Sequence, residues 1–145
     1  MRSYYPTIVS EPMSGPTSLN SFIFSHTIDA AFLHEMYEED YQYIEVIFEK
    51  VIDGFEENLQ AIQDNHRDKN LELLRKSVHK IKPSFGFAGL PAVQEKCRDF
   101  EAKCQAATSI NELDADFEDL MKSLQEAKTI ITDELKRLKS FNQTR

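Results

Sequence analysis

Apolar residues recur at steps of three and four along nearly the whole of this 145-residue chain from about residue 25 onward. That period places apolar side chains along one face of an α-helix, whereas a half-buried strand would alternate apolar and polar residues. No part of the sequence shows a strand pattern, and only four glycines interrupt the chain. The pattern therefore predicts an all-α protein.

The first two predicted helices precede a polar run at residues 63–70, QDNHRDKN. A short first helix should begin near residue 25, with Ser25 or Thr27 as its N-cap. Its apolar face would hold Ile28, Phe32 and Met36. A second helix should follow residues 38–40 and end before the polar run, because that composition is typical of a turn. Its apolar stripe consists of Ile44, Ile47, Phe48, Val51, Phe55, Leu59 and Ile62.

Three further helices are expected after the polar run. The third should begin near Asp68 and close at Gly89, since glycine readily adopts the left-handed conformation that follows many helices. Pro91 suits the first turn of a fourth helix, and Ser109 with Glu112 forms a capping box before a long fifth helix. The three apolar stripes are Leu71, Leu74, Val78, Ile81 and Phe85; then Val93, Cys97, Phe100 and Cys104; then Leu113, Phe117, Leu120, Leu124, Ile131, Leu135 and Leu138.

Four substantial amphipathic helices with short loops are typical of a bundle. We therefore predict an all-α, antiparallel four-helix bundle with a short extra N-terminal helix at one end. Residues 25–141 would form this domain. Residues 1–24, whose first 16 positions hold three of the five prolines, would form a flexible tail or linker.

The composition also limits the partners and the compartment. A formal net charge of −8 argues against nucleic acid or an anionic membrane as the partner, because both attract basic surfaces. No apolar run approaches the roughly 20 residues of a transmembrane helix, and the first 22 residues lack the apolar core of a secretory signal. We expect a cytoplasmic protein that is a monomer.

The chain has two cysteines, Cys97 and Cys104, seven residues apart. On a helix they would share one face about 10 Å apart along the axis, which is too far for a disulfide. Two thiols without a nearby histidine do not make a zinc site. We interpret them as structural thiols and expect no metal centre.

His79 stands out on the third predicted helix. On a helical wheel it lies about 120° from the centre of the apolar stripe, so we expect it to be exposed or at the margin of the core. Residues 69–82 carry five basic side chains against one acid, Glu72. Such a basic patch on an acidic protein predicts an anionic partner or modification.

The residues that follow His79 on this face are compact. Pro83 has a small ring and Gly86 has no side chain, so a large partner surface could approach the imidazole. Pro83 should also bend the helix, because it leaves the carbonyl of residue 79 without its usual donor. Each feature alone is common on ordinary helices, and the functional interpretation rests on their coincidence.

The stretch HKIKPSFGFAGL, residues 79–90, resembles the signature of the histidine-containing phosphotransfer (HPt) domain, His-x-x-Lys-Gly-Ser-x-x-x-x-Gly. His79, Lys82, Ser84 and Gly89 match it in register. The resemblance extends over about residues 27–140 and includes Cys97, where many family members place a small residue or cysteine. Pro83 departs from the signature, which usually has glycine there.

The resemblance implies that His79 takes a phosphoryl group from the aspartyl phosphate of a receiver domain and passes it to another. Lys82, one turn away, would stabilise the phosphoryl charge. The chain would be a carrier without kinase activity and without a cofactor, since Mg²⁺ would belong to the receiver. The partners would be response-regulator receivers and also a hybrid sensor histidine kinase. The residues expected to bind them are Arg75, Lys76, Pro83, Ser84 and Gly86.

Two other interpretations remain open from the sequence. The bundle could be a helical interaction module in which His79 is never phosphorylated. It could also be a metalloenzyme, although such bundles use Glu-x-x-His pairs, and none of the four histidines has a glutamate three residues before it.

Overall fold

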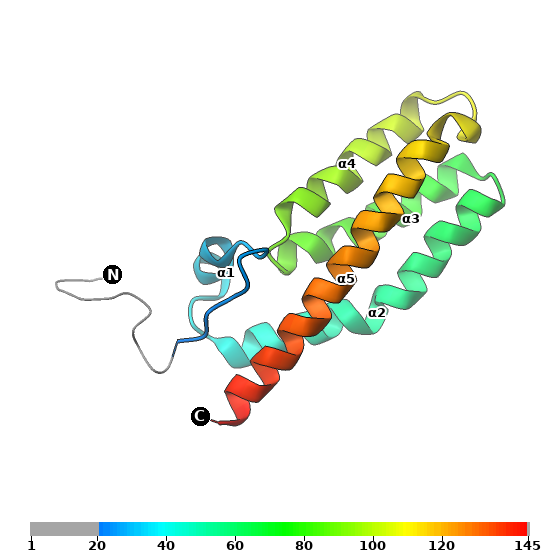
Figure 1. Cartoon of the computed structure of the whole chain (residues 1–145). Coiled ribbons are helices and arrows are strands. Elements are labelled where there is room, and N and C mark those ends of the chain that lie inside the picture. The colour runs from blue at the N-terminus through cyan, green and yellow to red at the C-terminus, as the bar shows by residue number, and fades with distance from the viewer. Residues whose placement is uncertain (1–20, 145) are drawn as a thin grey trace.

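A computed structural model describes residues 21–144 of the chain (Figure 1). The helices are α1 (Ala30–Tyr37), α2 (Tyr41–Arg67), α3 (Leu71–Phe87), α4 (Pro91–Ala106) and α5 (Asp114–Gln143), with a short 3₁₀ helix, η2 (Ile110–Leu113), before α5. The described residues contain no strand. No helix within residues 21–144 is long and apolar enough to span a membrane.

The four long helices form the predicted antiparallel bundle. Figure 1 shows α2 to α5 side by side, with α1 at the end where α2 begins and α3 ends. The bundle encloses one hydrophobic core that all the helices share. Its largest fully buried side chains are Phe48, Phe55, Phe85, Leu33, Ile44, Ile62, Leu74, Ile81, Leu120, Leu124, Ile131 and Leu138.

The first helix begins later than the sequence predicted. Its N-cap is Asp29, whose carboxylate accepts the Phe32 N–H at 3.0 Å, so the predicted caps Ser25 and Thr27 were wrong. Met36, which we placed on the apolar face, has half of its surface exposed. The short helix lies over the end of the bundle, and its core contact is Leu33.

The boundary between α2 and α3 was also predicted too early. α2 continues through the polar run to Arg67, and α3 starts at Leu71 with Asn70 as its N-cap. Polar residues extend α2 here because they find partners at this end of the bundle. The His66 ring stacks on Phe117 with centroids 3.7 Å apart, and its Nε2 lies 3.1 Å from Asp114.

The junction of α3 and α4 reverses the chain within three residues. α3 continues through Pro83 to Phe87 and ends in a Schellman motif, with Leu90 N–H donating to the Phe85 carbonyl at 2.7 Å and Gly89 N–H to Gly86 at 3.2 Å. Gly89 has the predicted left-handed backbone, with φ of 75°. Pro91 occupies the first turn of α4, and this compact turn sets the position of α4 against α3.

Capping before α5 follows the sequence in part. Ser109 and Glu112 form the predicted capping box, but it caps η2 rather than α5. α5 then begins at Asp114 without a side-chain cap of its own. The 3₁₀ turn is explained by burial, because Ile110 and Leu113 both reach the core from it.

The packed part of the chain begins before the predicted boundary at residue 24. Residues 1–20 of the predicted tail lie outside the described residues, but Phe22 is buried and stacks edge-on against Phe24 and Phe141. The Ser25 N–H donates to buried Glu134 at 2.6 Å. These contacts attach residues 22–25 to α5.

We predict that Gly89→Ala lowers the free energy of unfolding by about 2 kcal/mol. An alanine there would hold an unfavourable left-handed conformation, and its Cβ would meet Ile28 at 3.0 Å and Leu33 at 3.1 Å. Urea denaturation followed by circular dichroism measures the change. Gly54→Ala is the matched control, because a Cβ on this helical glycine meets only Asn58 at 3.8 Å, so it should leave stability unchanged or raise it by up to about 1 kcal/mol. Equal midpoints for both variants would contradict the role given to Gly89.

Candidate functional site

His79 lies on the outer face of α3, as its place in the sequence predicted. Its side chain is 65% exposed, whereas its helix neighbours Val78 and Ile81 are fully buried. The α3 stripe holds the helix against the core and so presents the imidazole to solvent. His79 is therefore accessible to a macromolecular partner.

A glutamate on α4 contacts both His79 and Lys82. Glu101 Oε1 lies 2.8 Å from His79 Nδ1, and Glu101 Oε2 lies 2.7 Å from Lys82 Nζ. The Glu101 side chain is only 12% exposed and that of Lys82 only 18%. The three side chains form one cluster in which a half-buried carboxylate links the imidazole to the ammonium.

The contact with Glu101 determines which nitrogen of the His79 ring carries the proton. A carboxylate accepts hydrogen bonds, so His79 Nδ1 must carry the proton that it shares with Glu101. In a neutral imidazole the other nitrogen then has the free lone pair. The contact accordingly leaves the lone pair of a neutral His79 ring on Nε2.

The sequence reasoning missed Glu101. The predicted turn could have indicated this residue. An antiparallel pair of helices that reverses near residue 90 places residue 79 opposite residue 101. The same register places Gly86 opposite Gln94, and these two residues are in contact. The glutamate was overlooked because it lies 22 positions after His79, and its proximity depends on the tertiary packing of α4.

The structure separates the residues that we expected to bind a partner. Lys76 and Pro83 are exposed on the His79 face. Arg75 is half-buried and makes a two-point ion pair with Glu72, with contacts of 2.8 and 3.3 Å. Ser84 is half-buried.

Gly86 does not leave open space beside His79. A Cβ at this position would lie 2.9 Å from the amide nitrogen of Gln94 on α4. The absence of a side chain therefore leaves room for the Gln94 amide against α3. Pro83, by contrast, is exposed on the His79 face, and its ring is compact.

Both cysteines are free, buried thiols, as expected from their spacing. Burial raises the pKa of Cys97 to about 12, with the Glu101 carboxylate adding to the rise and the Lys82 ammonium opposing it. Burial also raises the pKa of Cys104 to about 11. Cys97 therefore stays protonated at neutral pH.

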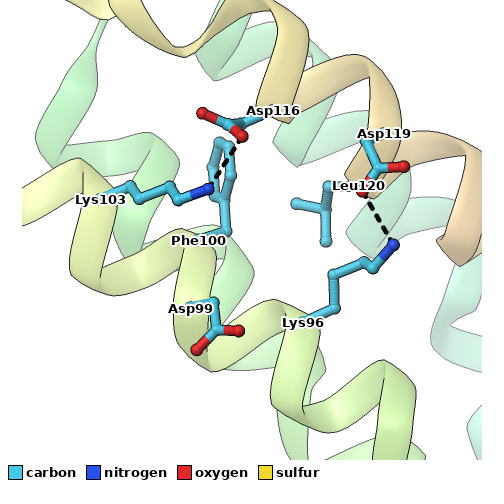
Figure 2. Close-up of a pocket in the computed structure, with 7 residues that line it drawn as sticks. All are labelled: Lys96, Asp99, Phe100, Lys103, Asp116, Asp119 and Leu120. Atoms are coloured by element: carbon cyan, nitrogen blue, oxygen red, sulfur yellow. Dashed lines mark hydrogen bonds and ion pairs between the residues drawn. The ribbon is translucent and has the colours of Figure 1, made fainter.

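A second surface feature lies between α4 and α5. A shallow pocket of about 140 Å³ has Phe100 and Leu120 at its base. Figure 2 shows an ion pair on each side of it, Lys103 with Asp116 at 2.9 Å and Lys96 with Asp119 at 2.8 Å. Because these pairs join α4 to α5, the pocket is a seam between two helices.

No group of three or more His, Cys, Asp or Glu side chains within residues 21–144 is arranged to hold a metal ion. Four cations on α3 and α4 are each paired with a carboxylate: Arg75, Lys82, Lys96 and Lys103. The described residues at His79 therefore offer one carboxylate, one ammonium and one imidazole for chemistry.

The fold matches a solved structure. The crystal structure of the HPT domain from an Hpt sensor hybrid histidine kinase of Shewanella superposes with a TM-score of 0.67 at 16% sequence identity. The match covers 77% of this chain and 96% of that one. The fold is therefore that of an HPt helical bundle. The comparison with curated proteins gave no match.

The sequence itself supports the same assignment. The profile of the Hpt domain family matches residues 46–140, which is more than half of the chain. The protein belongs to the Hpt domain family, whose members carry a phosphoryl group on a histidine in two-component phosphorelays.

We predict that the buried thiols make the free energy of unfolding fall as the pH rises above about 9. The folded state keeps Cys97 protonated up to about pH 12, whereas a thiol in the unfolded chain ionises near pH 9. Between these values the unfolded state binds fewer protons, so the free energy of unfolding falls as pH rises, by up to about 1.4 kcal/mol per pH unit for each thiol. Urea titrations from pH 8 to 10.5 should show this fall, and Cys97→Ala should show a smaller one. The same alkaline slope in both proteins would contradict the assignment.

Proposed function

We propose that the chain is a phosphotransfer intermediate in which His79 Nε2 accepts a phosphoryl group from the aspartyl phosphate of a receiver domain and passes it to a second receiver. The observation that carries this proposal is the exposed imidazole whose Nδ1 is held by Glu101 at 2.8 Å. Membership of the Hpt family supports the reaction class. The assignment of His79 as the phosphorylated residue is ours.

The chemistry needs one nucleophile and charge neutralisation. The Nε2 lone pair attacks phosphorus, an N–P bond forms, and the P–O bond to the receiver aspartate breaks, so that the aspartate leaves as a carboxylate. The ring keeps its Nδ1 proton and becomes cationic. Glu101 faces that proton and would stabilise the positive charge as it develops.

Lys82 would supply the positive charge for the phosphoryl oxygens. It lies three residues after His79, one turn along α3, and its ammonium is already next to the carboxylate that contacts His79. Phosphoryl transfer depends mainly on positioning and electrostatic stabilisation. We propose that the Mg²⁺ required for transfer is bound by the receiver, since its aspartate is the other reacting group.

An apolar patch at the α1 end of the bundle supports a macromolecular partner. The patch consists of Tyr37, Tyr43, Val46 and Phe87, which link α1, α2 and α3. The Tyr37 hydroxyl donates to the Phe87 carbonyl at 3.1 Å, and the Tyr37 and Tyr43 rings meet edge-on at 5.7 Å. Phe87 is 48% exposed and lies about 12 Å along α3 from His79.

Exposed apolar side chains so close to the proposed phosphoacceptor fit a receiver that covers the patch while its aspartate reaches His79. Lys76 and Pro83, which are exposed on the same side of α3, would lie inside this contact. The partner-binding surface we now propose therefore keeps Lys76 and Pro83 and adds the apolar patch. It leaves Arg75, Ser84 and Gly86 to packing within the bundle.

We predict that His79→Ala abolishes labelling by a phosphorylated receiver domain and leaves the helical circular dichroism spectrum unchanged. The side chain is exposed, so its removal should cost little stability. Labelling is measured with a ³²P-charged receiver, and His34→Ala, which changes an exposed histidine on α1, is the control. Equal labelling of wild type and His79→Ala would refute the carrier role and favour a helical interaction module.

We predict that Lys82→Ala slows phosphoryl transfer about tenfold, because it removes the ammonium that would neutralise the phosphoryl oxygens. The loss of rate should be modest because the His79 ring, which would carry the phosphoryl group, is 65% exposed to solvent and its charges are screened there. Stopped transfer assays over time give the rate. Lys80→Ala, which changes an exposed lysine on the same helix, should transfer at the wild-type rate, and an unchanged rate for Lys82→Ala would remove this lysine from the site.

A further inference from the structure

In the unphosphorylated site, Glu101 contacts both His79 and Lys82. In the structure Glu101 Oε1 accepts the Nδ1–H of His79 at 2.8 Å, and Oε2 forms an ion pair with the ammonium of Lys82 at 2.7 Å. One negative charge is balanced by one positive charge in a cluster where Glu101 is only 12% exposed. The resting state is therefore electrostatically satisfied.

Phosphorylation of His79 would break that balance. A phosphoryl group brings a charge of about −1.5 to −2, and it would need the Lys82 ammonium, which the carboxylate already holds. One ammonium cannot pair fully with both anions, and the half-buried carboxylate has little access to water as a substitute. The two anions therefore compete for Lys82.

The direct effects of the carboxylate on a phosphorylated ring largely offset each other. Glu101 attracts the ring proton on Nδ1 across a hydrogen bond, and it repels the roughly doubled charge of the phosphoryl group at roughly twice that distance. The competition for Lys82 has no such compensation, because the ion pair at 2.7 Å must weaken when the phosphoryl group forms. The competition for Lys82 therefore decides whether Glu101 stabilises or destabilises phosphorylated His79.

We propose that Glu101 is a positioning residue that lowers the stability of phosphorylated His79, by holding Lys82 away from the phosphoryl group, and so biases the domain toward passing that group on. This inference rests on the proposed function and concerns the regulation of the same site. Glu101 keeps the imidazole in its reactive tautomer and at the same time keeps the product state high in free energy.

The test compares the wild type with Glu101→Gln in a transfer equilibrium. The amide oxygen of glutamine can still accept the Nδ1–H, but the side chain no longer holds Lys82 by charge. Full-length protein is mixed with a ³²P-phosphorylated receiver, and the label on each partner is measured at equilibrium. We expect the ratio of phosphohistidine to phosphoaspartate to rise about tenfold in Glu101→Gln.

Asp99→Asn is the matched control, because it removes the same charge from an exposed position on the same helix. It should leave the ratio unchanged. A ratio in Glu101→Gln that is equal to or lower than that of the wild type would overturn the inference. The same rise in Asp99→Asn would also overturn it, since the effect would then come from net charge.

A second measurement tests the competition without transfer. Inorganic phosphate is titrated into each protein while the ¹⁵N signals of the His79 ring are followed by NMR. Glu101→Gln should show a dissociation constant several-fold lower than that of wild type, and equal constants would overturn the inference. If the constants differ but no protein takes label from any receiver, the proposed function fails while the competition for Lys82 stands.

Discussion

The tight turn between α3 and α4 is the constraint on which the site depends. Gly89 closes α3 with a left-handed backbone and Pro91 begins α4 two residues later, so the chain reverses with almost no loop. An antiparallel pair that reverses near residue 90 has a defined register, and that register brings Glu101 to His79. The same register places the Gln94 side chain of α4 against Gly86, where a Cβ would lie 2.9 Å from the Gln94 amide nitrogen.

Two helices supply the side chains of the candidate site. α3 supplies an exposed imidazole and a lysine one turn later, while α4 supplies the carboxylate that contacts both of them. A carboxylate in this place favours the neutral tautomer with the lone pair on Nε2, as the proposed transfer requires. In the proposed mechanism it would also make the accumulation of negative charge costly, which would suit a protein that passes a phosphoryl group on after accepting it.

Most of the bundle could be predicted from the spacing of apolar residues, since a helix of this length stays folded only if one face is buried. The errors lie where polar residues have long-range partners. The run at residues 63–67 resembled a turn, yet it is helical because His66 stacks on Phe117 from α5. Likewise, the start of the chain resembled a tail up to residue 24, yet Phe22 packs into the core against Phe141. Local composition could not reveal either contact.

The sequence by itself determined the helices, the solvent-facing position of His79, the lysine one turn beyond it and the glycine that ends α3, because each follows from the geometry of a single helix and its cap. The tertiary structure alone decided that Glu101 joins His79 to Lys82 and that Gln94 covers Gly86. The physical reason is that a helix orients its own side chains by its period, whereas contacts between helices depend on how closely two backbones can approach.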